Sequence, residues 1–127
     1  MTQPEAANNL ISFTLEDRAL FGVVETSSLM SVEAPMVGDV ILDEMQRSGD
    51  SINTIVVDLS RVNFINSLAL GMLVTVQTTV IQHGLEFCLL GVDPMVQKVL
   101  SSTRLDSVFR IFDTHSELKA ALHADQS

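Results

Sequence analysis

The sequence predicts an α/β protein with a mostly parallel central sheet and an antiparallel strand at its N-terminal edge. The first observation is a pair of apolar-rich segments, Ile11–Glu16 and Ala19–Glu25, which are separated by a two-residue turn and predict a β-hairpin. The second is that short apolar runs, typical of buried strands, alternate downstream with longer segments of helical periodicity. Because successive strand–helix units join parallel strands, we expect the order β-β-α-β-α-β-α-β-α, with four helices.

The first half of the chain supplies the hairpin, two helices and the central strand. Residues 26–33 are expected to form a connector. A helix follows at Ala34–Ser48, where apolar residues recur at helical spacing and Gly49 suits the position just past its end. Thr54–Leu59 is nearly continuously apolar, as expected of a central strand covered on both faces. The second helix, Leu68–His83, is apolar almost all round in its first half.

The second half repeats the strand–helix pattern twice. Glu86–Val92 is predicted to be a buried strand, and Asp93-Pro94 combines a preferred N-cap with proline at the first helical position. A short strand at Val108–Phe112 precedes Thr114, which has the form of a capping box ahead of the last helix. These signals place the third and fourth helices.

Length and composition favour one domain over residues 1–127, with a core at 11–122 and loose tails at 1–9 and 124–127. A chain of this length buries roughly two-thirds of the surface that it exposes when unfolded, so it needs neither disulfides nor metal. The single cysteine, Cys88, lies in an apolar run and is expected to be a small buried side chain rather than a reactive thiol.

The acidic composition restricts the classes of partner. A formal net charge of −9 disfavours nucleic acid and anionic membrane surfaces, which both attract Lys and Arg. The uncharged stretch 62–85 is long enough to cross a bilayer, but its many polar residues favour a half-buried helix instead. The N-terminus lacks the pattern of a secretory signal. We therefore expect a cytoplasmic protein without membrane insertion. Its acidity fits a partner protein with a basic docking face, although acidity alone more often only provides solubility.

A serine at the start of the second helix is the candidate regulatory residue. Ser67 follows the central strand and a short turn, so its hydroxyl is expected beside unpaired helix N–H groups and the positive end of the helix dipole. A phosphate on this residue would meet favourable local electrostatics. Two interpretations stay open: Ser67 is a modified switch, or it only caps the helix, which is worth about 1 kcal/mol.

Other polar and exposed candidates favour binding over catalysis. Asp58, at the end of the central strand, could be catalytic but is expected to fix the following turn through backbone N–H groups. Leu29 and Met30 either cover the end of the sheet or join a partner-binding patch. The histidines are scattered, and no hydrolase, P-loop or dinucleotide motif is present. We expect no enzyme, no cofactor and no metal site.

The element order and three sequence words resemble the STAS family, the domains of anti-sigma factor antagonists and of the cytoplasmic tails of sulphate transporters. The resemblance covers roughly residues 11–122. The words are Val57-Asp58-Leu59-Ser60, Phe64-Ile65-Asn66-Ser67-Leu68-Ala69-Leu70-Gly71 and Leu89-Leu90-Gly91-Val92.

The resemblance implies a role for Ser67. In antagonists of the family the loop reads Asp-Ser-Ser-Gly-Leu-Gly or close to it, and its first serine is phosphorylated by a partner anti-sigma factor that is itself a kinase. That serine falls on Ser67 and the closing Leu-Gly on Leu70-Gly71. The chain departs from the pattern at Asn66, which replaces the acidic residue, and at Leu68-Ala69, which replaces Ser-Gly.

What the resemblance implies is a partner switch. The unphosphorylated protein binds a serine kinase of the histidine-kinase-like ATPase fold, which uses Mg-ATP, and so frees a sigma factor; the phosphorylated protein is released. Asp58 and Asn66 are expected to support the loop, and a monomer is the default. The expected contact surface consists of Leu29, Met30, Leu68, Ala69 and Met72.

Two alternatives remain. The first is a non-phosphorylated STAS scaffold subunit of a larger regulatory or transport complex, which Asn66 favours. The second is a STAS domain that binds a small ligand or nucleotide, which is ranked lower because the chain has no phosphate-cradling glycine loop.

Overall fold

The computed structural model describes the backbone of residues 9–126 and the side chains of residues 9–123. Within this range the fold class expected from the sequence is confirmed, because strands and helices alternate in the predicted order and four α-helices are present. The tail expected at residues 1–9 lies almost wholly outside the described residues. Residues 124–126, expected to belong to a loose C-terminal tail, have helical backbone at the end of the last helix.

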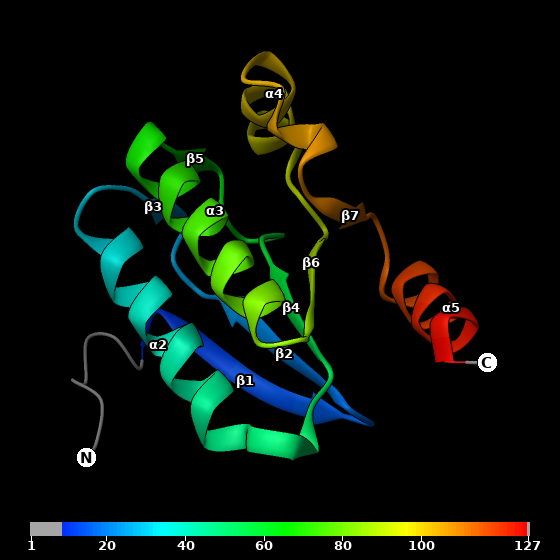
Figure 1. Ribbon diagram of the computed structural model, residues 1–127. Coiled ribbons are helices and arrows are strands. Elements are labelled where there is room, and N and C mark those ends of the chain that lie inside the picture. Colours follow the sequence, from blue (N-terminus) through cyan, green and yellow to red (C-terminus); the bar gives the residue numbers. More distant parts are fainter. Residues whose placement is uncertain (1–8, 127) are drawn as a thin grey trace.

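The central sheet has five strands in the order β1-β2-β4-β6-β7 (Figure 1). Strand β1 pairs antiparallel with β2, whereas the other three pairings are parallel. Because the parallel strands run the same way, their carboxyl ends meet at one edge of the sheet, where ligand and partner sites of such folds gather. The strand bounds are Ile11–Glu16, Ala19–Val24, Thr54–Asp58, Glu86–Leu90 and Arg110–Phe112.

The helices divide between the two faces of the sheet. Helices α2 (Glu33–Ser48) and α3 (Ser67–Gln82) pack against each other over one face, and α4 (Pro94–Ser102) adds to the same core. Helix α5 (His115–Gln126) covers the opposite face and is the one helix there among residues 9–126, as Figure 1 shows. The chain also forms two short 3-10 helices, η1 (Gly49–Ser51) and η2 (Leu105–Ser107).

Alternation along the central strands creates two cores. In β4, Ile55 and Val57 face the α2–α3 layer, whereas Val56 between them faces α5. This period of two, with both faces apolar, produces the continuous apolar run that marks a covered strand in the sequence. Cys88 lies in the smaller core beneath α5 and is fully buried, as expected.

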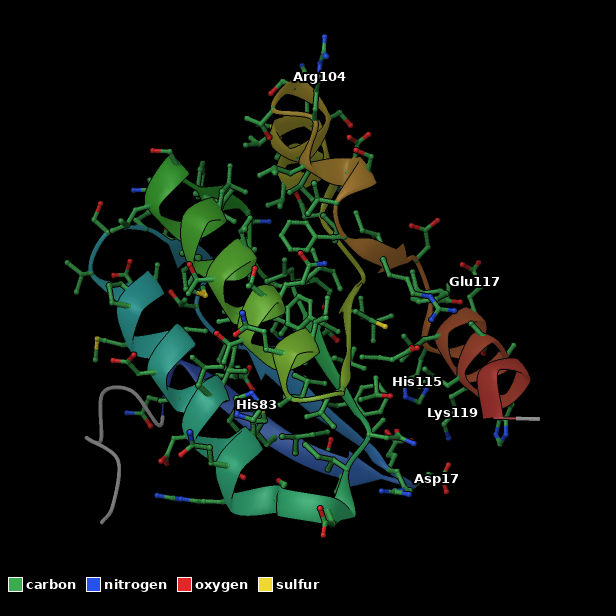
Figure 2. The ribbon with its side chains drawn as sticks, in the orientation of Figure 1. Asp17, His83, Arg104, His115, Glu117 and Lys119 are labelled. Carbon is green, nitrogen blue, oxygen red and sulfur yellow. The ribbon has the colours of Figure 1, made fainter. Side chains whose placement is uncertain are left out.

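Polar contacts attach α5 to the hairpin of β1 and β2. Figure 2 shows His115 and Lys119 on the side of α5 that faces the hairpin, whose turn contains Asp17. The Glu16 carboxylate accepts contacts from Lys119 Nζ at 3.1 Å and from His115 Nε2 at 3.2 Å. The hydrogen bond from Lys119 lowers the pKa of Glu16 below its ordinary value, with smaller help from the charges of His115 and Lys119. Glu16 therefore favours its ionised form when α5 is docked.

The N-cap signals of two helices are confirmed. Asp93 Oδ1 accepts a hydrogen bond from the backbone N–H of Met95 at 2.9 Å, and Pro94 follows at the first helical position. Thr114 Oγ1 accepts from the N–H of Glu117 at 3.1 Å at the start of α5. Side-chain oxygens thus satisfy N–H groups that have no partner inside either helix.

Two short strands were not expected. Within the predicted connector 26–33, β3 (Ser28–Leu29) pairs in parallel with β5 (Phe64–Ile65), which lies just before α3. The uncharged stretch 62–85 accordingly forms β5, α3 and their flanking loops. Across residues 9–126, no helix combines the length and the apolar character that a membrane crossing requires.

Candidate functional site

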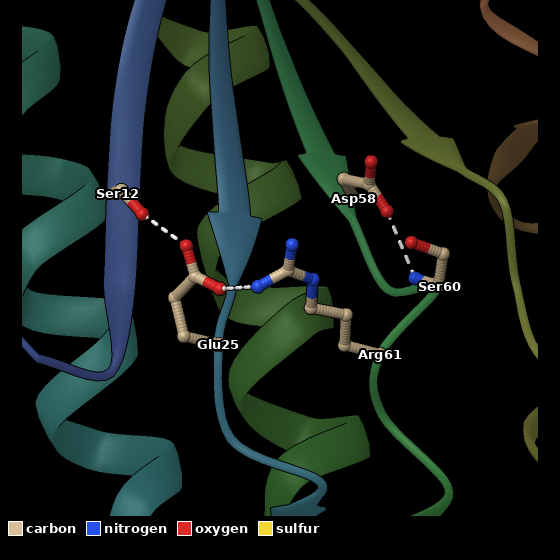
Figure 3. Close-up of polar contacts among 5 residues, drawn as sticks. All are labelled: Ser12, Glu25, Asp58, Ser60 and Arg61. Atoms are coloured by element: carbon tan, nitrogen blue, oxygen red, sulfur yellow. Dashed lines mark hydrogen bonds and ion pairs between the residues drawn. The ribbon is translucent and has the colours of Figure 1, made fainter.

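The candidate site begins where β4 ends. Asp58 Oδ1 accepts a hydrogen bond from the backbone N–H of Ser60 at 2.8 Å (Figure 3), and the N–H of Leu59 donates to the carbonyl of Leu90 at 3.0 Å. A carboxylate that bonds the N–H two residues on closes an Asx-type turn. Asp58 therefore fixes the turn, as the sequence analysis expected.

A chain of polar contacts holds the next part of the loop against the sheet. Figure 3 shows Arg61 paired with the Glu25 carboxylate, which also accepts a hydrogen bond from the Ser12 hydroxyl. Gly91 lies close by with a φ of 64°, and a Cβ there would lie 3.2 Å from Ser60 Cβ. The close approach of the β6 end to this loop thus depends on glycine, which accepts positive φ without a steric penalty.

The small β3–β5 sheet anchors the loop from a second side. The N–H groups of Asn63 and Phe64 both donate to the carbonyl of Ser27, at 2.8 and 3.1 Å. The Asn63 side chain donates to Asp93 Oδ2 at 3.3 Å, which links the loop to the start of α4. Two segments far apart in the sequence, at Ser27 and at Asp93, therefore position the residues that precede α3.

Asn66, rather than Ser67, is the N-cap of α3. Its backbone is extended, with φ −117° and ψ 179°, and its Oδ1 accepts from the N–H of Ala69 at 3.0 Å. Its Nδ2 donates to Ser31 Oγ at 3.0 Å, so one amide ties α3 to the segment before α2. The interpretation of Ser67 as the cap is wrong, because Ser67 is already the first helical residue. Asn66 does support the loop, as expected.

The capping by Asn66 leaves the Ser67 hydroxyl available. Ser67 is exposed, and its hydroxyl makes no hydrogen bond to any residue whose side chain the structure describes. The first turn of α3 contains no acidic residue, and the N–H groups at its start face outward from the helix. The hydroxyl is thus accessible at a helix end that suits negative charge.

Four exposed apolar side chains lie on Leu68 and on the segments that the small sheet and the Asn66–Ser31 bond join to the start of α3, and we call them the apolar rim. Leu68 is adjacent to Ser67 in sequence and 50% exposed, whereas the others come from the strands and loops that β3–β5 pairing and the Asn66–Ser31 bond bring to this place. Sequence reasoning missed two of them, although large apolar residues in a short polar connector were the available signal. The rim consists of Met30, Val32, Phe64 and Leu68.

The expected contact surface needs correction at two residues. Leu29 and Ala69 are fully buried, so neither is available to a partner in this fold. Pairing with β5 directs Leu29 into the main core, and Ala69 lies on the face of α3 that packs on the sheet. Met30 and Leu68 are exposed, and Met72 is partly buried. Their role in binding stays a prediction.

A groove lies between α2 and α3 and begins beside Ser67. It has a volume of about 410 Å³ and an apolar lining. The two helices come close at Gly38: a Cβ added there would lie only 2.8 Å from Met72 Cγ. Asp39 is the one charged residue in the lining, among the residues that the structure describes. The groove and the apolar rim meet at Ser67 and Leu68.

The fold and this site define a class of α/β domain: a mostly parallel sheet with an antiparallel edge, and a serine at the start of the helix that follows the central strand. The sequence profile of the STAS domain matches residues 10–118, so the chain belongs to the STAS domain family. The resemblance seen in the sequence is thereby confirmed.

Individual relatives fit this assignment. A candidate anti-sigma factor antagonist of Thermotoga neapolitana is 38% identical over 77 residues, which is 61% of this chain and 66% of that protein. The match thus spans slightly less than two thirds of the relative. The crystal structure of a candidate anti-sigma factor antagonist of Thermotoga maritima has a TM-score of 0.79 and 26% identity, covering 94% of this chain and 99% of that one.

The Bacillus cell-fate determinant SpoIIAA, an anti-sigma factor antagonist, has the same fold. Its unphosphorylated form has a TM-score of 0.72 and 16% identity, covering 90% of this chain and 96% of that one. Its phosphorylated form has a TM-score of 0.64 and 14% identity, covering 88% and 98%. At these identities the likeness concerns the fold alone.

Proposed function

We propose that the protein is an anti-sigma factor antagonist that acts by partner switching. In this proposal it binds an anti-sigma factor that is a serine kinase, and phosphorylation of Ser67 releases it. Membership of the STAS family and the names of its relatives support the general role. The observation that carries the proposal is the exposed Ser67 hydroxyl, which has no capping role and lies beside the exposed Leu68 of the apolar rim.

Phosphorylation of Ser67 would change binding far more than folding. A phosphate adds about −1.5 to −2 charges at neutral pH. The start of α3 tolerates this charge because of the helix dipole, so the domain stays folded. A partner packed on the apolar rim would have to bury the phosphate, and removal of an ion from water costs several kcal/mol. Since each 1.4 kcal/mol is a tenfold loss of affinity, such a cost dissociates a complex.

The charges near Ser67 add to this effect. Asp39 lines the adjoining groove, whose described lining contains no basic side chain that could pair with a phosphate. The compensating cation would therefore have to come from the partner. A partner that packs apolar residues against the neutral hydroxyl places no cation at Ser67 itself, and the phosphorylated complex is weakened.

The antagonist in this proposal is a binding protein and not an enzyme. It acts in the cytoplasm as a monomer and needs no cofactor of its own, since the Mg-ATP belongs to the kinase. Leu68, Met30 and Met72 contact the partner, and Asp58 and Asn66 hold the loop in the geometry that presents Ser67.

The test is phosphorylation by the native partner. The partner is captured from the source cell, purified, and incubated with the protein and Mg-ATP, followed by intact-mass analysis and phosphopeptide mapping. We expect one phosphate on Ser67 and a loss of affinity of about 100-fold or more, which corresponds to about 2.8 kcal/mol or more. The Ser67→Ala variant should bind without being modified. Ser60→Ala, at another exposed serine of the same loop, is the matched control and should behave as wild type.

A second candidate function is a scaffold subunit of a larger regulatory or transport complex. Asn66 favours it, because an amide replaces the acidic residue that precedes the serine in the family's antagonists. A stoichiometric complex that is unchanged by Mg-ATP, with no phosphate on Ser67, would support the scaffold role and contradict the switch.

A further inference from the structure

Neither the backbone conformation nor a steric contact within the described residues requires a glycine at position 71 of α3. It lies in the second turn of the helix with no positive φ, and a Cβ built there would meet no atom within 4 Å. A helix with glycine in its interior is less stable than the same helix with alanine. No contact within the described residues offsets this loss of stability at Gly71. Gly38 of α2 differs, because a Cβ there would collide with Met72 Cγ at 2.8 Å.

The open space above Gly71 belongs to the groove between α2 and α3. The lining runs from Ser67 to Val76 along α3, about 14 Å at 1.5 Å per residue. This length accommodates two to three turns of a helix or a few extended residues. The opposite wall, from α2, contains Pro35, Asp39 and Leu42. The groove is therefore shaped for a segment of chain that lies along the helices.

The charge of the groove defines the segment further. Asp39 is exposed, and its carboxylate makes no ion pair or hydrogen bond with any residue between 9 and 123. No basic residue lines the groove in that range. A single carboxylate beside an otherwise apolar surface is complementary to a segment with apolar side chains and one Lys or Arg.

We propose that this groove binds an apolar segment of the anti-sigma factor, with a basic side chain of that segment against Asp39 and its backbone in close approach at Gly71. The inference rests on the proposed function and extends it from the apolar rim to a second contact region. Because Ser67 stands where the rim and the groove meet, one phosphate lies at the edge of both contact regions.

The test fills the groove without disturbing the fold. In Gly71→Leu the added Cβ meets no neighbouring atom within 4 Å and the rest of the side chain extends into the groove, so the variant should fold and be at least as stable to urea as wild type. Its Kd for the purified anti-sigma factor, measured by calorimetry, should rise at least tenfold. Gln82→Leu is the matched control: it adds the same side chain at an exposed position of α3 outside the groove and should leave Kd unchanged.

The charge contact has its own variant. Asp39→Asn should raise Kd several-fold and reduce the salt dependence of binding, whereas Asp50→Asn, an exposed carboxylate in η1, should do neither. Wild-type affinity of Gly71→Leu for the anti-sigma factor would overturn the groove proposal. The proposal would also be wrong if the substitution abolished self-association of the protein, or its binding of a fatty acid, and left binding of the anti-sigma factor unchanged.

Failures of the two proposals are distinguishable. If Gly71→Leu binds as wild type while phosphorylation of Ser67 still releases the partner, the groove proposal fails and the switch stands. If the anti-sigma factor binds the groove as expected but Ser67 is never modified, the switch fails and the groove stands. If the wild-type protein binds no anti-sigma factor, both are wrong.

Discussion

Substitutions at Asn66 and Ser67 separate helix capping from regulation, because the structure assigns the cap to the first residue and leaves the second exposed. Asn66→Ala removes the acceptor for the N–H of Ala69 and the donor to Ser31 Oγ, two bonds of 3.0 Å. Ser67→Ala removes a hydroxyl that bonds no described residue. The two variants should therefore differ in stability, although the substituted residues are adjacent in the sequence.

The expected magnitudes follow from these contacts. Loss of an N-cap side chain costs about 1 kcal/mol of the free energy of unfolding. The exposed bond to Ser31 adds roughly 0.5 kcal/mol. Asn66→Ala should thus be less stable by about 1–2 kcal/mol, whereas Ser67→Ala should lie within about 0.5 kcal/mol of wild type. Asn66→Asp retains the cap and gains about 0.3–1 kcal/mol from its charge at the helix start.

Urea denaturation followed by circular dichroism measures these differences, and thermal melts provide a second measurement. For a domain of this length, about 1–2 kcal/mol should lower Tm by roughly 3–10 °C. Equal destabilisation by Ser67→Ala and Asn66→Ala would refute the reasoning, since it would make Ser67 a cap. A stable Asn66→Ala variant would show that neither bond contributes in solution.

Three further predictions concern the framework of the site. Gly91→Ala forces a Cβ onto a residue with φ 64° and within 3.2 Å of Ser60 Cβ, so urea denaturation should show a loss of about 1–2 kcal/mol; an unchanged midpoint would contradict the close approach. Leu29→Ala truncates a fully buried side chain and should cost about 2–5 kcal/mol, whereas a surface role would cost almost nothing. The pKa of Glu16 is lowered in the folded protein, so its contribution is complete above the ordinary carboxyl pKa of 4.5 and is lost as pH falls through the lowered value. The stability difference between wild type and Glu16→Gln should accordingly shrink on acidification, and a difference that grows would reverse the assignment.

The main sheet and its helices were predictable because their residues repeat with a period. β1 was predicted to span the residues that it occupies, and α3 begins one residue before the predicted start. Strands β3 and β5 could not be predicted in this way, since two residues cannot display an alternation. Their pairing depends on the partner strand, which lies more than thirty residues away in the chain.

The candidate site was predictable in its location but not in its detail. Asn66 and Ser67 are both favourable N-cap residues, and the sequence contains nothing that ranks them. The decision depends on Ser31, which the fold brings to the Asn66 amide from 35 residues away. The burial of Leu29 and Ala69 is likewise set by tertiary packing. The exposure of Val32 and Phe64 depends on the pairing of β3 with β5, which is not encoded in a local sequence pattern.

Because the core is divided into two unequal parts, the cysteine in the smaller part can report the local opening of the helix that covers it. Cys88 is the one cysteine in the sequence, is fully buried, and lies in the smaller core that α5 covers alone. A thiol reagent in solution can reach it only during local opening, and α5 is the element whose departure uncovers this face. The rate of alkylation, compared with that of the unfolded chain, therefore measures how often α5 leaves the sheet, without any introduced label.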